Sequence, residues 1–191
     1  MAKTDFKPGT MIYPLPAVMV SCGETPEEYN IITIAWTGTI CSDPPMCYIS
    51  VRPGRTSYPI IKRSGEFVIN LTTEKLARAT DWCGCRSGRK FNKWKEMKLT
   101  PQPSKMVNAP GIAESPVNIE CVVKQVIPLG THDMFIAEVV NITVDDTYMD
   151  EKGAFSLSKA LPLVYNHGHY FGLGKPIGKF GWSVEKKKKT N

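Results

Sequence analysis

The sequence contains no long apolar run, and this absence excludes a membrane-spanning protein. Met1–Pro8 is polar, and prolines 14 and 16 interrupt the segment Met11–Val20. No stretch approaches the roughly 20 apolar residues that a membrane helix requires, and no signal peptide is recognisable at the start. We therefore expect a cytoplasmic protein without a membrane partner. The six cysteines fit that compartment as free thiols.

Several families of catalytic motif are also missing. The chain has only three histidines, no serine in a nucleophile-elbow pattern, and neither a Rossmann nor a Walker fingerprint. The spacing of Cys83-Gly84-Cys85 is too short for a zinc knuckle, and no second Cys/His pair matches it. We favour a structural or ligand-contacting role for this pair and leave a redox role open. A metal site at His167 and His169 lacks an obvious third ligand.

The positive charge of the chain is concentrated at one end. Four of the charges that make up the formal net charge of +6 come from Lys186–Lys189, within a lysine-rich tail that covers residues 185–191. Because no aromatic residue interleaves this run, we interpret it as a solvated tail and expect no nucleic-acid partner. With no internal repeat and no domain boundary, the 191 residues predict a single domain over 1–191.

Alternating apolar residues predict a mainly β chain that forms an antiparallel sheet or barrel. The first four expected strands cover Ala17–Cys22, Asn30–Ile40, Met46–Val51 and Glu66–Leu71, with a hairpin turn at Gly23–Tyr29. Two longer strands, 117–127 and 134–144, predict a second hairpin whose turn carries His132, which we expect to be solvent-exposed rather than catalytic.

Two helical segments and two irregular ones complete the expected fold. Thr73–Trp82 has a helical composition with Gly84 as its stop, and Gly88–Met97 places apolar residues at three-residue spacing. Prolines make 101–110 an extended linker. Leu161–Trp182 is rich in glycine and without periodicity, and therefore predicts a loop ordered by packing on a ligand or a partner subunit.

The most informative segment is Met46–Tyr58, in which a strand ends at a Pro-Gly reversal. The reversal gathers Arg52, Arg55, Thr56 and Ser57 immediately before a short helical pattern. Thr and Ser are common helix N-caps, and free N–H groups at a helix start attract anions. The segment favours a phosphate site, with an ordinary turn carrying solvated arginines as the alternative. A phosphate site without acid–base residues indicates a cofactor that carries the reaction itself.

Motifs along most of the chain resemble one family in their order and spacing. They are Ala35-Trp36-Thr37-Gly38-Thr39, Ser42-Asp43-Pro44-Pro45, the RPGRTSY turn, Gly65–Leu71, Asp81–Gly84, Ser87–Arg89, Ser115–Cys121 and Gly178–Ser183. With these motifs the chain resembles the flavin reductase family with the FMN-binding split barrel, and most of all its flavoredoxin-like branch. The resemblance implies a mainly β, six-stranded antiparallel split barrel with a few helices. It also implies a homodimer that holds FMN near the subunit interface.

The resemblance further implies positions for the cofactor-binding residues. The tricyclic ring would lie along residues 35–39, the phosphate beside residues 50–52 and 55–58, and the tail would cover the site. The residues expected to bind FMN are Ala35, Trp36, Thr37, Gly38, Thr39, Ser50, Val51, Arg52, Arg55, Thr56, Ser57, Tyr58, Ser87, Lys90, His169 and Tyr170, with Arg52 and Ser57 expected to contribute most to phosphate binding.

The implied activity is that of an FMN-dependent oxidoreductase. Such a protein transfers hydride or electrons between NADH or NADPH, or a redox protein, and an acceptor, with no catalytic side chain because the flavin carries the chemistry. The alternative is a non-catalytic protein that stores or senses FMN. Both functions use the same residues, and no motif indicates the choice between NADH and NADPH or the identity of the acceptor.

Overall fold

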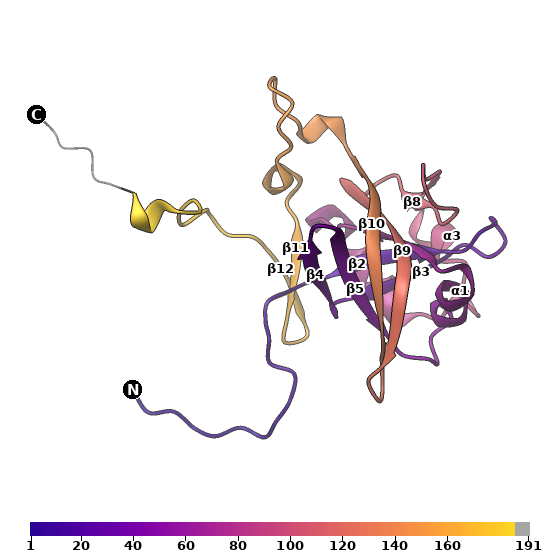
Figure 1. The fold of residues 1–191 in the computed structure, drawn as a ribbon, viewed down its shortest axis with the longest axis horizontal. Helices are drawn as coiled ribbons and strands as arrows, with labels where there is room; N and C mark the ends of the chain where they lie inside the picture. The colour runs from indigo at the N-terminus through magenta and orange to yellow at the C-terminus, as the bar shows by residue number, and fades with distance from the viewer. Residues whose placement is uncertain (186–191) are drawn as a thin grey trace, which may run out of the picture.

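The fold is built on one curled antiparallel sheet with a few short helices (Figure 1). A computed structural model describes residues 1–185, so the lysines of the expected tail lie outside the described residues. The strand order of the sheet is β3-β2-β6-β9-β10-β5-β4. These strands are β2 (Val18–Cys22), β3 (Asn30–Ile34), β4 (Thr37–Ser42), β5 (Pro45–Val51), β6 (Glu66–Asn70), β9 (Val117–Pro128) and β10 (Asp133–Val144).

The sheet closes through a break that the sequence does not signal. Asn30–Ile40, expected to form one strand, is divided into β3 and β4, which lie at opposite edges of the sheet. Ile34 still pairs with Val18 of β2, whereas the carbonyl of Trp36 accepts a hydrogen bond from Ser50 N at 2.9 Å. Only two residues separate the edge strands, so the sheet must curl to bring its edges together. The sheet has seven strands, so the expected count of six was wrong for it.

Apolar side chains fill the inside of the curl. Phe67, Ile49 and Phe135 have no exposed surface and belong to a cluster contributed by β2, β3, β5, β6, β9 and β10. Burying such a side chain stabilises the fold by about 1.5–3 kcal/mol. The predicted hairpin of β9 and β10 is confirmed along its whole length. The same core contains Cys47 of β5 and Cys121 of β9, whose sulfur atoms lie 3.6 Å apart.

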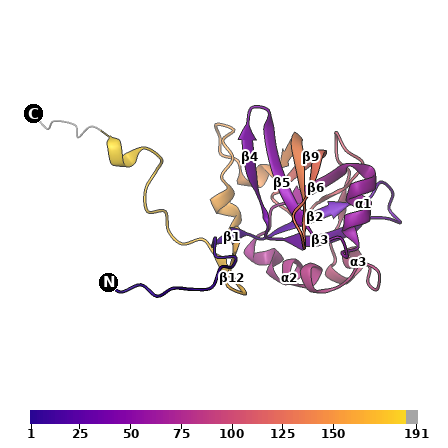
Figure 2. The same cartoon turned by 60° about the horizontal axis from the view of Figure 1, so that its bottom comes forward.

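Three helices pack against the sheet, and two differ from expectation (Figure 2). They are α1 (Ser57–Ser64), α2 (Ala77–Cys85, preceded by a 3-10 turn at Glu74–Leu76) and α3 (Lys93–Met97). Helix α2 continues through Gly84, whose missing side chain allows close packing on Thr33 of β3, so Gly84 is a contact point and not a stop. Helix α3 is shorter than predicted because Asn92 caps it, accepting a hydrogen bond from Lys95 N at 3.1 Å.

A buried carboxylate holds the proline-rich segment 101–110 against the sheet. Glu120 of β9 accepts hydrogen bonds from the backbone N–H groups of Lys105 at 3.0 Å and Met106 at 2.6 Å, and from Asn141 Nδ2 at 2.7 Å. The segment begins with β7 (Pro101–Gln102), which pairs with β8 (Gly111–Ile112). It is therefore an anchored element and not a free linker.

The C-terminal third contains a second, smaller sheet where an irregular loop was expected. β11 (Leu163–Asn166) lies between β12 (His169–Gly172) and β1 (Leu15–Pro16). From this sheet, residues 1–12 and 173–185 extend away from the barrel on the same side (Figure 1). Further 3-10 turns lie at Asp146–Tyr148, Leu157–Ala160 and Trp182–Val184. Within residues 1–185 no helix has the length and apolar character needed to cross a bilayer.

Candidate functional site

Two adjoining cavities open between β3, the turn after β5, and the segment that joins α2 to α3. The first, which we call the Trp36 cavity, has a volume of about 310 Å³ and is lined by residues 32–36 and 50–52 together with Arg55 and His132. The second, the Ser57 cavity, has a volume of about 260 Å³. Ile32 and Arg55 line both cavities, so the two form one continuous groove.

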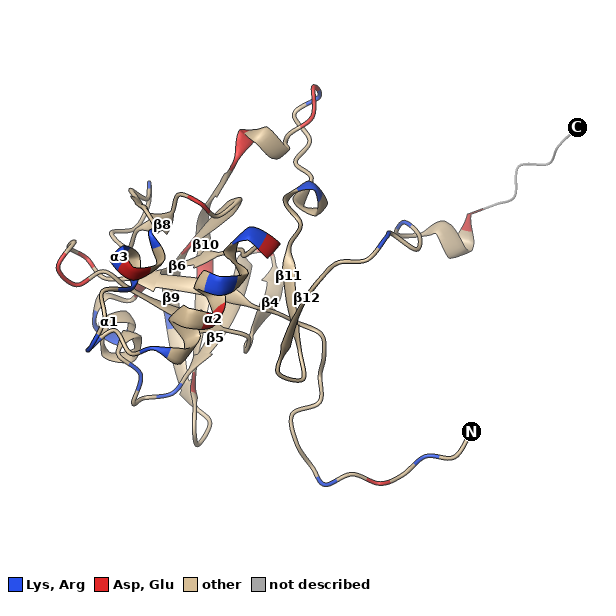
Figure 3. Cartoon of the chain, turned by 180° about the vertical axis from the view of Figure 1, so that it is seen from behind, with Lys and Arg blue, Asp and Glu red and all other residues tan. Residues whose placement is uncertain are grey.

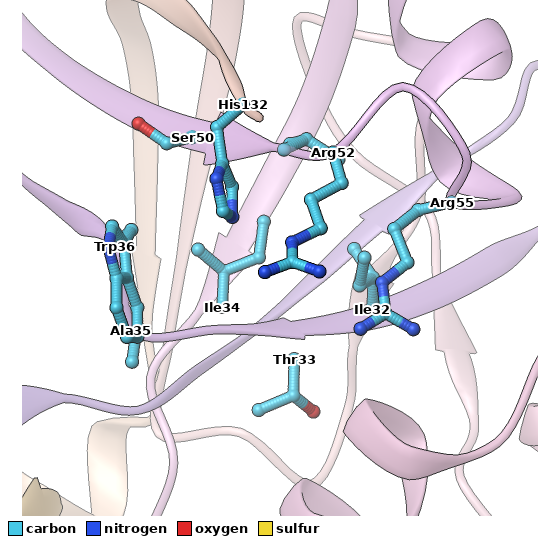
Figure 4. Close-up of a pocket in the computed structure, with 10 residues that line it drawn as sticks. Ile32, Thr33, Ile34, Ala35, Trp36, Ser50, Arg52, Arg55 and His132 are labelled. Carbon is cyan, nitrogen blue, oxygen red and sulfur yellow. The ribbon is translucent and has the colours of Figure 1, made fainter. Parts of the chain in front are cut away.

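The Trp36 cavity combines flat and apolar walls with two cations. Its apolar surface comes from the end of β3 and from Ala35, and the guanidinium groups of Arg52 and Arg55 point into it (Figure 4). The Trp36 indole and the His132 imidazole lie nearly parallel, at 3° with 6.4 Å between ring centroids. Partial burial, followed by the charges of the two arginines, lowers the pKa of His132. A neutral imidazole beside an indole suits a flat aromatic ligand.

The Ser57 cavity is lined by hydrogen-bond donors. Asn30 Nδ2 donates to Ser57 Oγ at 2.8 Å, which leaves the serine hydroxyl proton free to donate to a ligand. Thr56 and Ser87, which also line this cavity, meet at 3.2 Å between their hydroxyl oxygens. Arg55, Arg86 and Lys93 also line the cavity, and none of its described lining residues is acidic. This donor set fits an anion with several oxygen atoms.

Lys93 is the most unusual of these residues because it is only 4% exposed. Its Nζ donates to the carbonyl oxygens of Ile31 and Cys83, each at 2.6 Å, and thereby joins β3 to α2. An ammonium group has three protons, so one remains for a ligand in the cavity. Burial lowers the pKa of Lys93, since desolvation disfavours the charged form. An anion in the cavity would oppose that shift.

Most of the predicted binding residues line this groove. Ala35, Trp36, Ser50, Val51 and Arg52 lie at the Trp36 cavity, and Thr56, Ser57 and Ser87 at the Ser57 cavity, with Arg55 at both. Arg52 and Ser57, expected to act together on a phosphate, therefore line different halves of the groove. Thr56 was expected to cap α1 with its side chain, but it makes no such hydrogen bond because its backbone is already helical. Its hydroxyl contacts Ser87 instead.

The remaining predicted residues lie outside the two cavities of this chain. Thr37 donates through Oγ1 to the carbonyl of Tyr48 at 2.6 Å, and Gly38 packs on the Tyr48 ring. Tyr58 is a core residue that packs edge-on against Phe135 and donates to Asp133. Thr39 of β4, Lys90, His169 and Tyr170 complete this group, of which Lys90 lines a third cavity and Tyr170 contacts Asp81 at 3.3 Å.

Sequence reasoning missed several groove residues, because tertiary contacts and not local patterns bring them there. His132, expected to be an exposed turn residue, reaches the cavity because Asp133 pairs with Val51 at the end of β5. Asn30 and Lys93 carry no motif. The only available signal was a lysine within the apolar stripe of Gly88–Met97. The other missed residues are Ile32, Thr33, Ile34, Gly54, Gly84 and Arg86.

The Cys83 and Cys85 thiols do not face each other. Residues two apart in an α-helix point to different sides, and Cys83 is fully buried while Cys85 is exposed. Burial raises the pKa of Cys83 to about 11, so the thiol stays protonated at neutral pH. The arrangement supports the structural interpretation of Cys83. Among residues 1–185, moreover, no group of three or more His, Cys, Asp or Glu side chains could hold a metal ion.

Comparison with known proteins identifies the family. Residues 10–174 match the flavin reductase like domain. The chain belongs to this family. An uncharacterized protein of Archaeoglobus fulgidus is 31% identical over 141 residues, which are 74% of this chain and 78% of that protein.

Solved structures share the fold of this chain. Flavoredoxin of Desulfovibrio vulgaris (Miyazaki F) superposes with a TM-score of 0.89 at 28% identity, covering 96% of this chain and 100% of that one. An FMN-binding protein from Thermus thermophilus superposes with a TM-score of 0.79 at 20% identity, covering 93% of this chain and 99% of that one. The predicted family and the mainly β split-barrel class are therefore confirmed.

The groove of this flavin reductase-like chain fits the two ends of a flavin nucleotide. A flat heteroaromatic ring matches the apolar and aromatic walls of the Trp36 cavity. A phosphate matches the donor-rich Ser57 cavity, where the buried ammonium of Lys93 has a proton to spare. Because the two cavities meet at Arg55, one extended molecule can occupy both.

Proposed function

We propose that this protein is an FMN-binding oxidoreductase of the flavin reductase or flavoredoxin type. The observation that carries the proposal is the continuity of a flat-walled cavity with a donor-rich one that has no acidic lining residue. The family and the likeness to flavoredoxin support a flavin as the ligand. The FMN-binding protein of Thermus thermophilus, which shares the fold, supports the mononucleotide.

The Ser57 cavity would hold the phosphate through charged and neutral donors. Arg55 would approach from the turn after β5, and Ser57 would offer its hydroxyl proton. Lys93 would approach from α3 with its remaining ammonium proton. Hydrogen bonds from cations to phosphate are roughly twice as strong as neutral ones. Asn30 acts as a positioning residue because its bond to Ser57 Oγ fixes the orientation of the hydroxyl.

The Trp36 cavity would hold the ring, and a bound flavin supplies the capacity to accept and donate hydride or electrons. Ala35 and Trp36 would border the ring with main chain and indole, and Ser50 would offer it a hydroxyl, since all three line this cavity. Arg52 and His132 close the side opposite β3, where they limit the entry of water (Figure 4). Arg52 would therefore act on the ring rather than on the phosphate.

NADH or NADPH is the proposed electron donor, with a redox protein as an alternative partner. Anaerobic mixing of the FMN-loaded protein with each nicotinamide tests this. We expect loss of the flavin absorbance near about 450 nm at a catalytic rate, of the order of 1–1000 per second. Failure of both nicotinamides to bleach a bound flavin would instead support the storage or sensor function.

We also propose that the chain functions as a homodimer, which its resemblance to the flavin reductase family implies. Ile177, Phe180 and Val184 are almost fully exposed on the C-terminal segment, and Ile12 is similarly exposed on the N-terminal one. Several large apolar side chains this exposed on the same two segments favour an interaction surface. Light scattering should give about 43 kDa, twice the 21.3 kDa of the chain, and deletion of residues 173–191 should lower it. A mass of one chain at micromolar concentration would exclude the dimer.

A further inference from the structure

The tip of the β9–β10 hairpin brings His132 to the Trp36 cavity, and two local contacts shape this tip. Leu129 N donates to the carbonyl oxygen of His132 at 2.9 Å, which closes the turn. Thr131 Oγ1 lies 2.9 Å from His132 Nδ1 and restrains the rotation of the imidazole. Both contacts lie within the tip, so they fix its shape and not its position relative to the groove.

Asp133, the residue that follows His132, ties the tip to helix α1. Its backbone pairs with Val51 of β5, and its carboxylate accepts a hydrogen bond from Tyr58 Oη. Tyr58 is the second residue of α1, is 9% exposed, and packs edge-on against Phe135 with 5.4 Å between ring centroids. Because the buried ring is held by the core, its hydroxyl group offers the carboxylate a fixed donor.

A lysine one turn further along α1 supports this hydrogen bond. Lys and Arg residues mark α1 (Figure 3), and Lys62 lies on the same face as Tyr58 because four residues separate them. Lys62 Nζ donates to Tyr58 Oη at 3.4 Å and lies 5.5 Å from the centroid of the tyrosine ring. Hydrogen bonds in a chain polarise one another, so the lysine strengthens the tyrosine hydroxyl as a donor to Asp133.

Helix α1 thereby connects the two halves of the groove. Its first residue, Ser57, lines the Ser57 cavity, and the next residue, Tyr58, holds the hairpin tip. The imidazole of His132 on that tip lies nearly parallel to the Trp36 indole, at 3°, across the Trp36 cavity. The hydroxyl of Tyr58 therefore affects the Trp36 cavity, although Tyr58 itself lines neither cavity.

We propose that Tyr58 is a positioning residue, which holds the His132 imidazole in the Trp36 cavity through its hydrogen bond to Asp133. Tyr58 was expected to bind FMN itself, whereas in this inference it acts on the flavin through His132. The effect on the flavin rests on the proposed function, but the link from Tyr58 to His132 needs no ligand. Loss of the hydroxyl should release the tip, expose the imidazole to water and open one wall of the Trp36 cavity.

Three variants and one control isolate the hydrogen bond in the full-length protein. Tyr58→Phe removes the hydroxyl and keeps the ring against Phe135. Asp133→Ala and Asp133→Asn both remove the negative charge, but only the asparagine keeps an oxygen that accepts a hydrogen bond. Tyr165→Phe removes the hydroxyl of a tyrosine in β11, a strand of the smaller sheet, and is the matched control for Tyr58→Phe.

Proton NMR titration of the histidines in the flavin-free protein tests the link from Tyr58 to His132. Partial burial, followed by the charges of two arginines of the Trp36 cavity, lowers the pKa of His132 in the wild type. Release of the tip should move this pKa back toward 6.5 in Tyr58→Phe, and further toward 6.5 in Asp133→Ala than in Asp133→Asn. The control should match the wild type, and the other two histidines of the chain serve as internal references.

A double-mutant cycle with riboflavin separates this role from a merely structural one. Riboflavin carries the ring without the phosphate, so its affinity reports on the Trp36 cavity. Tyr58→Phe should weaken riboflavin binding at least about fivefold in the wild type but less than about twofold in a His132→Gln background, because the hydroxyl acts through the imidazole. A packing defect at Tyr58 would weaken binding equally in both backgrounds.

These measurements test the inference separately from the proposed function. An unchanged pKa of His132 in Tyr58→Phe, or equal losses of riboflavin affinity in the two backgrounds, overturns the inference. If the wild type binds no flavin, the proposed function fails, and the histidine titration alone decides whether Tyr58 positions His132.

Discussion

Replacing Gly88 with alanine should damage the wall of the Ser57 cavity. A Cβ atom at this position would lie 2.2 Å from Asn30 Oδ1 and 2.8 Å from Asn30 Cγ. Such distances are far inside van der Waals contact, so the Asn30 side chain must move. Because Asn30 is buried and donates to Ser57 Oγ at 2.8 Å, the movement breaks that hydrogen bond.

The expected cost combines two effects. Loss of a neutral hydrogen bond costs about 0.5–1.5 kcal/mol, and forcing an extra methyl group into a packed site costs about 1–3 kcal/mol. Together they lower the free energy of unfolding by about 2–4 kcal/mol. For an m value of about 2 kcal/mol per molar urea, the unfolding midpoint should fall by about 1–2 M.

Gly54→Ala is the matched control for this variant. Gly54 lines the same cavity, but a Cβ atom there meets nothing within 4 Å. Both substitutions restrict the unfolded chain equally, by about 0.4–1 kcal/mol, so the difference between them isolates the contact with Asn30. Urea unfolding followed by circular dichroism measures both midpoints. Equal midpoints for Gly88→Ala and Gly54→Ala would refute the packing that places Asn30 against Ser57.

Three further predictions concern the burial of side chains away from the Trp36 cavity. With a thiol reagent at pH 8, only the thiols of Cys85 and Cys41 should react quickly in the native protein, because the other four cysteines are buried; fast reaction of more thiols would contradict the core. Glu120→Gln should lower the free energy of unfolding by about 2–4 kcal/mol, because it turns an amide group toward three hydrogen-bond donors. Burial alone would raise the pKa of Glu120, but its hydrogen bonds lower the pKa below 4.5. The difference in unfolding free energy between wild type and Glu120→Gln should therefore shrink as the pH falls below 4.5. A difference that stays constant with pH would exclude a stabilising role for the ionised carboxylate. Lys93→Met should weaken FMN binding at least tenfold, since a charged hydrogen bond is worth about 1.5–3 kcal/mol. Because burial lowers the pKa of Lys93 from 10.5, the wild type should gain stability relative to this variant as the pH rises toward 10.5, and an unchanging difference would contradict the burial.

The parts of the fold that depend on local patterns could be predicted from the sequence. The β9–β10 hairpin follows from two long alternating runs around one turn, and α1 begins where the Pro-Gly reversal ends. Barrel closure could not be predicted, because the alternation of Asn30–Ile40 continues unchanged through Ala35 and Trp36. The break arises from pairing with strands that are distant in the sequence, and only the folded sheet contains that information.

The same division holds for the groove. Arg52, Arg55 and Ser57 share one turn and were predicted together, although the structure places Arg52 at the Trp36 cavity and Ser57 at the Ser57 cavity. His132 and Lys93 reach it from a hairpin tip and from a short helix, and each depends on packing between remote elements. A lone lysine or histidine in a sequence does not specify such an approach.

Comparison of FMN with riboflavin tests the central claim most directly, because the two ligands differ only in the phosphate. If Arg55, Ser57 and Lys93 bind the phosphate, FMN should bind at least about 30-fold more tightly, which corresponds to about 2 kcal/mol. The combined change Arg55→Ala and Ser57→Ala should remove most of that difference while riboflavin affinity stays the same. Equal affinities of the wild type for FMN and riboflavin in a fluorescence titration would contradict the account.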